Sequence, residues 1–378
     1  MNIAIVCGAR PNFIKVAPII RAVRNDSARQ LLAKPVACRL VYAGRADDLT
    51  LEPSLFDELG IAPPDVFLGV DCDNLNELTG QVMSKFECYL HENHTDAVIV
   101  VDDLASTMAV SIVTKKQGVL LAHIAAGTRS FDISMPKEIN RLVIDGLSDM
   151  LFTAGLSNNS IANREGAELS KVYMVGNILM DNLRYDHDRI VTAVLPDEVE
   201  RIVRPAGKDG ATVPYLVFTL NRKALIANRD NLYRMLSQMM AVVGDMPVIA
   251  PLRDKAVEAV VSLGLHRGLD LHSLHIVSPM GYLQFGRLTA EATGIITDSG
   301  NVAEEATFNQ VPCITLNSYT EHIETVKVGT NVLVGEDPAV LASAVNDMVH
   351  CEWKKSAIPD RWDGRTAERI LQILVGQG

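Results

Sequence analysis

The sequence has no apolar run near the roughly 20 residues that a membrane-spanning helix needs. Its continuous apolar stretches, such as residues 97–101, have the length of a strand. None of the six cysteines forms a CxxC or a cysteine–histidine pair at zinc spacing, so we expect reduced thiols and no bound metal. No basic segment precedes an apolar stretch and a cleavage site near Met1, which predicts a protein without a signal peptide, located in the cytoplasm.

Basic residues are also in the minority. The chain has 35 lysines and arginines against 46 aspartates and glutamates, a net charge of −11. This balance disfavours nucleic acid as a partner, since nucleic-acid binding needs a basic face. It does not exclude a small anionic ligand, because a site in an acidic protein can be locally positive.

Strand-like and helix-like segments alternate along the 378 residues, a length typical of about two domains. Short apolar runs suit strands that are buried on both faces, and the stretches after them carry apolar residues at helical spacing. The expected strands are 2–7, 40–43, 97–101, 119–124, 150–153, 172–175, 215–219, 248–251, 276–277, 294–297, 312–316 and 331–334. The expected helices are 105–117, 138–147, 231–243, 282–290, 301–308, 338–348 and 366–377, and one that follows the first strand.

The alternation loosens around residues 184–214 and then resumes. This predicts an α/β protein with two doubly wound, Rossmann-like domains facing each other across a cleft, with domains at 1–183 and 184–365. Ligands of such sheets bind at the carboxyl ends of the strands, where helices begin.

The first motif at such a position is the turn at residues 8–12, followed by Lys15. Gly8 permits a sharp turn into a helix, and Arg10 and Lys15 are suited to a phosphate. The alternative is an ordinary strand–helix turn with two solvated cations.

A second motif lies at residues 297–301, between a strand and a helix. Ser299 and Gly300 are suited to a diphosphate, and Glu305 to the two hydroxyls of a ribose. The alternative is that Asp298 or Ser299 only caps the helix.

Two further segments carry charged residues after strands. Asp102 and Asp103 stand where a strand turns into a helix, as a general base or as a helix cap. Glu138 and Arg141 lie three residues apart on one helix face, as part of a site or as a surface ion pair.

Together these motifs resemble the non-hydrolysing UDP-N-acetylglucosamine 2-epimerase family, which has the GT-B fold. Residues 8–11 with Lys15 resemble the family's GTRPE…K opening, and residues 297–305 resemble TDSGGxQEE. The other matches are residues 102–103 (GDT), 123–129 (HVEAGLR), 136–141 (PEEINR), 176–177 (GNT) and 319–322 (TTERPE). The resemblance implies a last helix, 366–378, that packs back on the first domain, which is also the sugar or acceptor side and the dimer interface.

Several residues depart from the family pattern. Ala125 and Lys137 stand where the family has glutamates, Asn221 replaces a histidine and His322 replaces an arginine. The segment that in the family takes a second ligand molecule reads Gly-Arg-Ala at 44–46 here, so we expect no activation by a second substrate molecule.

The resemblance implies C2 epimerisation of a UDP-HexNAc-type sugar nucleotide, through elimination and re-addition of UDP, without cofactor or metal. The implied partners are UDP or a UDP-sugar and a second copy of the chain in a homodimer. The candidate catalytic residues are Asp103, Glu138 and Lys137. The candidate nucleotide-binding residues are Arg10, Lys15, Arg141, Arg222, Ser299, Gly300 and Glu305, with Asn221 and His322 as candidate substrate contacts. The alternatives are a GT-B sugar-nucleotide hydrolase or glycosyltransferase, and a catalytically silent nucleotide-sugar-binding homologue.

Overall fold

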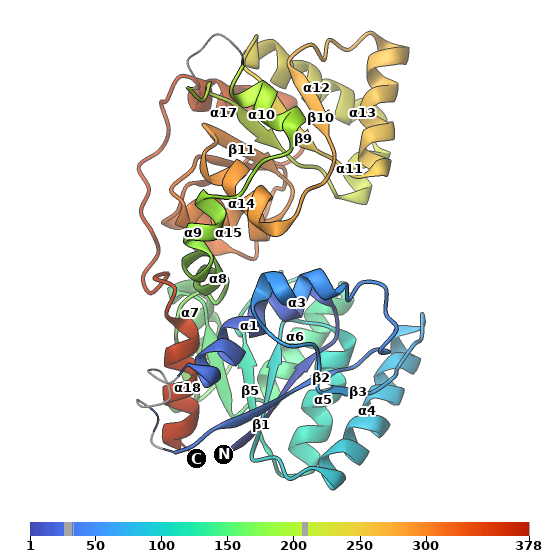
Figure 1. Cartoon of the computed structure of the whole chain (residues 1–378), viewed down its shortest axis with the longest axis vertical. Coiled ribbons are helices and arrows are strands. Elements are labelled where there is room, and N and C mark those ends of the chain that lie inside the picture. The colour runs from blue at the N-terminus through green and yellow to red at the C-terminus, as the bar shows by residue number, and fades with distance from the viewer. Residues whose placement is uncertain (26–31, 33, 206–210, 378) are drawn as a thin grey trace. The chain divides into compact units, whose positions relative to one another are not determined.

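The computed structural model describes residues 1–25, 32, 34–205 and 211–377 (Figure 1). The chain divides into two compact units. Unit 1 consists of Met1–Tyr185 and Asp360–Gly378, and unit 2 of Asp186–Pro359. The divisions thus follow Tyr185 and Pro359, where we had predicted divisions after residues 183 and 365.

Unit 1 is built on a seven-stranded parallel sheet with the order β3-β2-β1-β4-β5-β6-β7. Its strands are β1 (Asn2–Cys7), β2 (Ala37–Tyr42), β3 (Val66–Phe67), β4 (Ala97–Val101), β5 (Leu120–Ile124), β6 (Met150–Thr153) and β7 (Val172–Met174). Its helices are α1 (Arg10–Arg24), α3 (Pro53–Leu59), α4 (Leu75–Glu92), α5 (Ala105–Lys116), α6 (Pro136–Leu147), α7 (Leu156–Arg164), the short η1 (Leu169–Lys171), α8 (Leu179–Tyr185) and α18 (Thr366–Gln377).

The apolar strands of this sheet are covered on both faces. Ile3 and Ile5 of β1 pack into a core that includes residues of α1 and α18. Ala4 and Val6 point the other way, into a core that includes residues of α4 and α5. Successive residues of a strand face opposite sides, so a strand between two helical layers is apolar along its buried length, as β4 is throughout and β1 is after Asn2.

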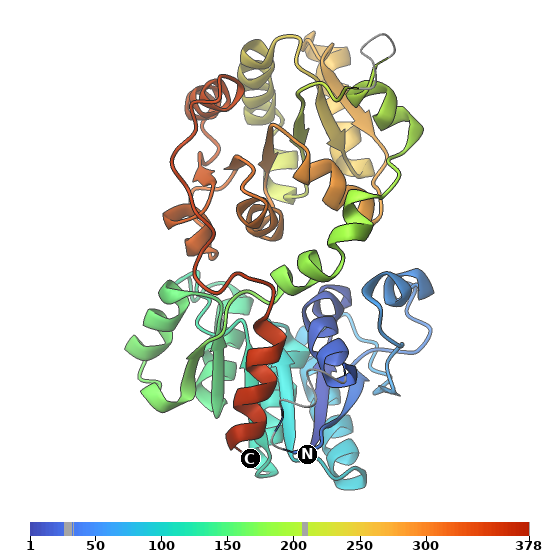
Figure 2. The same cartoon turned by 60° about the vertical axis from the view of Figure 1, so that its left-hand side comes forward.

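The C-terminal segment returns to unit 1, as predicted, and α18 lies along its sheet (Figure 2). The indole Nε1 of Trp362 donates to the carbonyl of Ala154 at 2.9 Å. Asp181 of α8 then accepts from the first backbone N–H groups of α18, those of Thr366 and Ala367, at 3.0 and 2.8 Å. Burial raises the pKa of Asp181 to about 6, although these two bonds oppose the rise.

Unit 2 has a six-stranded parallel sheet with the order β10-β9-β8-β11-β12-β13. Its strands are β8 (Leu216–Phe218), β9 (Val248–Pro251), β10 (Leu274–Val277), β11 (Gly294–Thr297), β12 (Cys313–Thr315) and β13 (Asn331–Leu333). Its helices are α9 (His187–Val191), α10 (Asp197–Val203), α11 (Lys223–Ala227), α12 (Arg229–Val243), α13 (Asp254–Arg267), α14 (Tyr282–Ala290), α15 (Gly300–Phe308), α16 (Ile323–Lys327) and α17 (Pro338–Val349).

Candidate functional site

In unit 1, the candidate residues gather where β4 and β5 end. Two residues there are not glycines and yet have a positive φ: Asp102 at 60° after β4, and Ala125 at 66° after β5. This conformation costs an L-residue about 1–2 kcal/mol and persists only where surrounding bonds enforce it. Asp102 and Asp103, called here the β4 corner, are accordingly held by bonds from several elements of unit 1.

The Asp102 side chain ties the β4 corner to the first turn of the chain. Its Oδ1 lies 2.5 Å from Nζ of Lys15, and its Oδ2 accepts from Nδ2 of Asn12 at 3.0 Å. Asn12 also accepts the backbone N–H groups of Gly8 and Ala9. Lys15, a predicted phosphate ligand, thus has a carboxylate partner within unit 1.

Asp103 stands between two cations. Its Oδ2 accepts from Nε and Nη2 of Arg141 at 2.9 and 2.6 Å, and its Oδ1 lies 3.6 Å from Nζ of Lys137. The Asp103 side chain is 12% exposed and that of Lys137 is 61% exposed. Asp103, Arg141 and Lys137, all predicted site residues, therefore lie together. Lys137 is the one of the three whose side chain reaches solvent.

Glu138 is buried and holds a loop. Its carboxylate accepts from the backbone N–H groups of Ser130 and Phe131, from the hydroxyl of Ser130 and from Nη1 of Arg141, each at 2.9–3.0 Å. Burial alone would raise the pKa of Glu138, but these donors outweigh it and hold the pKa below its usual range. Glu138 is thus a fixed carboxylate at neutral pH, whose geometry fits a structural anchor better than a proton donor.

A buried network behind the β4 corner is centred on Asp145, which was not among the predicted site residues. Asp145 of α6 accepts from Nδ1 of His123 at 2.6 Å, from Nη2 of Arg129 at 2.7 Å and from the backbone N–H of Gly127 at 3.0 Å. Burial raises the pKa of Asp145, but His123 and Arg129 outweigh this and hold it low. The other ring nitrogen of His123 lies 3.0 Å from the carbonyl oxygen of Asp102, so the network supports the strained residue directly.

In unit 2, the candidate residues gather where β8, β11 and β12 end. Asp298 follows β11, and its Oδ2 accepts the backbone N–H groups of Asn221 and Arg222, both at 2.6 Å. Arg222 in turn bonds Oδ1 of Asn317 at 2.6 Å and lies 3.2 Å from Glu336. These bonds bring the segment after β8 to the segment that precedes α15.

The start of α15 is formed by Ser299 and Gly300. Ser299 is the N-cap residue, and within the described chain its side chain makes no capping hydrogen bond. Gly300 is needed for a close approach, because a Cβ on it would lie 2.3 Å from Nε2 of His322. The helix start, the Ser299 hydroxyl and the His322 ring are thus neighbours.

Glu304 and Glu305 follow on the same helix. Glu304 is 6% exposed and its Oε1 lies 2.9 Å from Nδ1 of His322. Burial raises the pKa of Glu305 to about 7, and the charge of Glu304 adds to the rise. Unlike Glu304, Glu305 has no ion pair among the described residues, which suits a carboxylate that receives hydroxyl groups from a ligand.

The predicted residues therefore form two groups, one in each unit. Unit 1 contains the cluster around Asp103, and it also contains Arg10, which is exposed at the first position of α1. Unit 2 contains Arg222, Ser299, Gly300, Glu305 and His322, together with the exposed Asn221.

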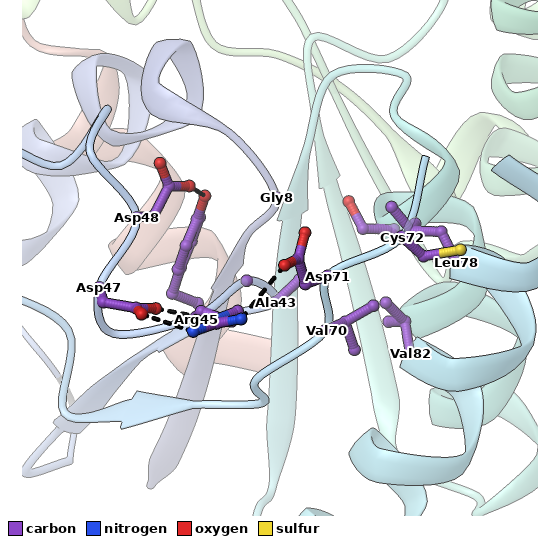
Figure 3. A pocket seen from close by; sticks show the side chains of 13 residues that line it. Gly8, Ala43, Arg45, Asp47, Asp48, Val70, Asp71, Cys72, Leu78 and Val82 are labelled. Carbon is purple, nitrogen blue, oxygen red and sulfur yellow. Dashed lines mark hydrogen bonds and ion pairs between the residues drawn. The ribbon is translucent and has the colours of Figure 1, made fainter. Parts of the chain in front are cut away.

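A cavity of about 380 Å³ lies beside the first group, at the carboxyl ends of β1, β2 and β3 (Figure 3). Gly8, Val70 and Ser106 line it, and its rim carries Arg45 between Asp47 and Asp71. Asp48, a third carboxylate, accepts from the Tyr42 hydroxyl. One guanidinium against three carboxylates disfavours an anionic ligand in this cavity.

The described residues contain neither a metal-binding cluster nor a membrane-spanning helix. Within them, no group of three or more histidines, cysteines, aspartates and glutamates is arranged to hold a metal ion. No helix in this part of the chain is long and apolar enough to cross a bilayer.

Comparison with known proteins identifies the family of the chain. Residues 30–375 match the profile of the family described as UDP-N-acetylglucosamine 2-epimerase. The chain is 30% identical over 380 residues to the UDP-N-acetylglucosamine 2-epimerase of Methanocaldococcus jannaschii, covering 99% of each protein. It is also 30% identical over 341 residues to the UDP-2,3-diacetamido-2,3-dideoxy-D-glucuronate 2-epimerase of Pseudomonas aeruginosa, covering 89% of this chain and 88% of that protein.

Solved structures agree with this. The crystal structure of the M. jannaschii enzyme in complex with UDP-GlcNAc and UDP matches with a TM-score of 0.79 and 30% identity, covering 100% of both chains. The predicted doubly wound fold is confirmed by this match and by the two parallel sheets. The chain belongs to the UDP-N-acetylglucosamine 2-epimerase family.

Proposed function

We propose that this protein is a sugar-nucleotide 2-epimerase that acts on a UDP-HexNAc-type substrate. The observation that carries the proposal is the match over the full chain, at 30% identity, to a protein whose crystal structure is described with UDP-GlcNAc and UDP. The two named relatives act on a neutral and on an acidic sugar, so both UDP-GlcNAc and its 2,3-diacetamido uronate counterpart are substrates to test.

The residues of unit 2 suit the nucleotide. The backbone N–H groups at the start of α15 and the Ser299 hydroxyl would bind the diphosphate, since a helix N-terminus favours an anion. Glu305 would accept the ribose hydroxyls, and Arg222 would add positive charge toward the leaving group. Glu305 must be ionised for this role, so its pKa of about 7 makes nucleotide binding weaker in acid.

The residues of unit 1 suit the proton transfer. In the proposed reaction a base takes the proton from C2 while the C1–O bond to UDP breaks, which leaves a 2-acetamidoglucal. UDP then adds back to C1, and a proton returns to C2 from the other face. Asp103 is the candidate base, oriented by Arg141, and the Lys137 ammonium is the candidate donor.

One observation favours a second candidate, a nucleotide-sugar-binding homologue without turnover. Every bond that the structure gives to Glu138 belongs to a loop or to Arg141, and Ala125 has no group that can carry a proton. A general acid or base contributes about 10²–10⁴ in rate, so a chain with fewer of them retains binding more readily than catalysis.

Product analysis separates the candidates. The protein is incubated with each sugar nucleotide, and products are resolved by anion-exchange chromatography and identified by proton NMR. A UDP-ManNAc-type isomer supports the epimerase, and its yield should fall at least a hundredfold in Asp103→Asn. The yield should not fall in the control Asp149→Asn, which removes a carboxylate of unit 1 that pairs with Lys115. Free UDP indicates a hydrolase, transfer only with an added acceptor indicates a glycosyltransferase, and saturable binding without products indicates the silent homologue.

We also propose that the protein is a homodimer formed through unit 1. Four large apolar side chains on α6 and the loop before it are exposed: Phe131, Ile133, Ile139 and Leu142 are 66%, 74%, 50% and 42% accessible. Such a patch is typical of a protein interface. Light scattering after size exclusion should give twice the mass of one chain, and the double variant Ile139→Glu with Leu142→Glu should give the mass of a single chain.

The cytoplasmic location stays a prediction.

A further inference from the structure

A carboxylate–imidazole pair stands at the start of α15. Glu304, on the second turn of that helix, is 6% exposed. His322 precedes α16, and its Nδ1 lies 2.9 Å from Oε1 of Glu304. A buried carboxylate 2.9 Å from Nδ1 favours a proton on that nitrogen, and with it the tautomer whose Nε2 carries the lone pair.

The other ring nitrogen faces the helix start. A Cβ on Gly300 would lie 2.3 Å from Nε2 and 2.4 Å from Cδ2 of His322, so this edge of the ring packs directly on the first residue of α15. The His322 side chain is 24% exposed, which leaves it accessible to a ligand. Nε2 therefore stands beside the backbone N–H groups that the proposed function assigns to the diphosphate.

We propose that His322 binds the diphosphate of the sugar nucleotide only as the imidazolium, with Glu304 as the residue that positions it. The inference rests on the proposed function and adds a pH-dependent ligand to its nucleotide site. When Glu304 holds the proton on Nδ1, the neutral ring presents the lone pair of Nε2 to the phosphate oxygens and repels them. Protonation turns Nε2 into a charged donor, and the same position becomes attractive.

Charged groups of both signs lie near His322 in the chain. Glu304 on α15, 2.9 Å from Nδ1, attracts the imidazolium, and the other charged residues nearby in the chain are Glu321 and Glu324 and, on α16, Lys327. Glu305 responds oppositely to pH, because its pKa of about 7 removes its charge in acid. The affinity for a UDP-sugar should therefore pass through a maximum near neutral pH, with His322 causing the loss on the alkaline side and Glu305 the loss on the acid side.

The test is calorimetric titration with UDP-GlcNAc from pH 5.5 to 8.5. Its diphosphate diester does not titrate in this range, unlike the terminal phosphate of UDP. Histidine titrates near pH 6.5 in peptides, and a charge-assisted hydrogen bond to phosphate is worth about tenfold or more in affinity. We expect the wild type to lose about tenfold in affinity between pH 6.5 and 8.5.

Four variants show which residue causes the loss of affinity at alkaline pH. His322→Gln should bind weakly across the alkaline range, with no further decline. His322→Arg, a permanent cation, should keep the high affinity up to pH 8.5. Glu304→Gln should move the alkaline decline to lower pH, and the surface variant His272→Gln should match the wild type.

Uridine lacks the diphosphate, and its binding can be followed by NMR titration. Its affinity should still fall in acid through Glu305, but it should not fall in the alkaline range. The inference is overturned if UDP-GlcNAc binds and the alkaline decline persists in His322→Gln, or if the wild type shows no decline. The proposed function fails separately if UDP-GlcNAc does not bind to wild type or to His322→Arg at any pH, while both melt cooperatively.

Discussion

Replacing Asp145 by asparagine should destabilise unit 1 by about 3–5 kcal/mol, the usual cost of removing one partner from a buried charge pair. The Arg129 side chain is 1% exposed and that of His123 is 2% exposed, so neither gains solvation when the carboxylate is lost. Arg129 keeps Glu165 as a partner, but the Glu165 side chain is 34% exposed and less able to compensate. Asparagine keeps one acceptor oxygen, which limits the loss to this range.

The protein offers a natural probe for this measurement. It has two tryptophans, Trp362 in unit 1 and Trp353 in unit 2. In a Trp353→Phe background, urea unfolding followed by tryptophan fluorescence reports on unit 1. Glu368→Gln, which removes an exposed ion pair with Arg365, is the control and should change the free energy of unfolding by less than about 1 kcal/mol.

The pH dependence has a definite sign. Because the pKa of Asp145 is lowered in the folded protein, its stabilisation is full above the pKa of the unfolded chain and is lost as pH falls through the folded value. The difference in the free energy of unfolding between wild type and Asp145→Asn should therefore become smaller as the pH falls. A loss below about 1 kcal/mol at pH 7, equal to that of Glu368→Gln, would refute the reasoning, because the network would then carry no net stabilisation.

Three further predictions concern single side chains. The pKa of Asp181 is raised from 3.8 to about 6 on folding, so ionised Asp181 lowers the free energy of unfolding by about 3 kcal/mol at pH 7. Relative to Asp181→Asn, the wild type should gain that stability as pH falls from 6 to 4. A stability difference between the two proteins that does not change with pH would contradict this. Gly300→Ala should displace His322 and weaken UDP-GlcNAc binding at least tenfold at neutral pH, measured by calorimetry; unchanged affinity would show that the approach is not tight. Glu138→Gln should lower the free energy of unfolding by about 2–3 kcal/mol, measured by urea titration. Lys137→Gln changes an exposed side chain and should lower it by less than about 0.5 kcal/mol. Equal effects of the two substitutions would contradict the anchoring role of Glu138.

Much of the fold could be predicted because most of its strands are short and largely apolar. β1 and β4 lie between two helical layers, and such strands are visible as short apolar runs bounded by glycine or charge. Helices whose surface mixes polar and apolar residues were harder to predict from the sequence. We had assigned no structure to Leu75–Glu92, the longest helix described, because its polar residues blur the helical spacing. The two-residue strand β3 has too little sequence to form any pattern.

The candidate site was predictable only in part, for a different reason. Residues adjacent in the chain, such as Ser299 and Gly300, could be assigned to one helix start. Partnerships across the sheet could not: Asp145 lies 22 residues from His123, and His322 lies 18 residues from Glu304. His123 and Arg129 lie in the motif at residues 123–129, but no pattern in the sequence indicated that Asp145 is their partner.

A 2-epimerase must move the proton on C2 of a UDP-HexNAc. Proton NMR of UDP-GlcNAc with the protein in D₂O tests this step directly. We expect deuterium at C2 together with the growth of a manno isomer, both abolished in Asp103→Asn. A C2 proton that stays unexchanged while saturation transfer shows UDP-GlcNAc bound would contradict this expectation.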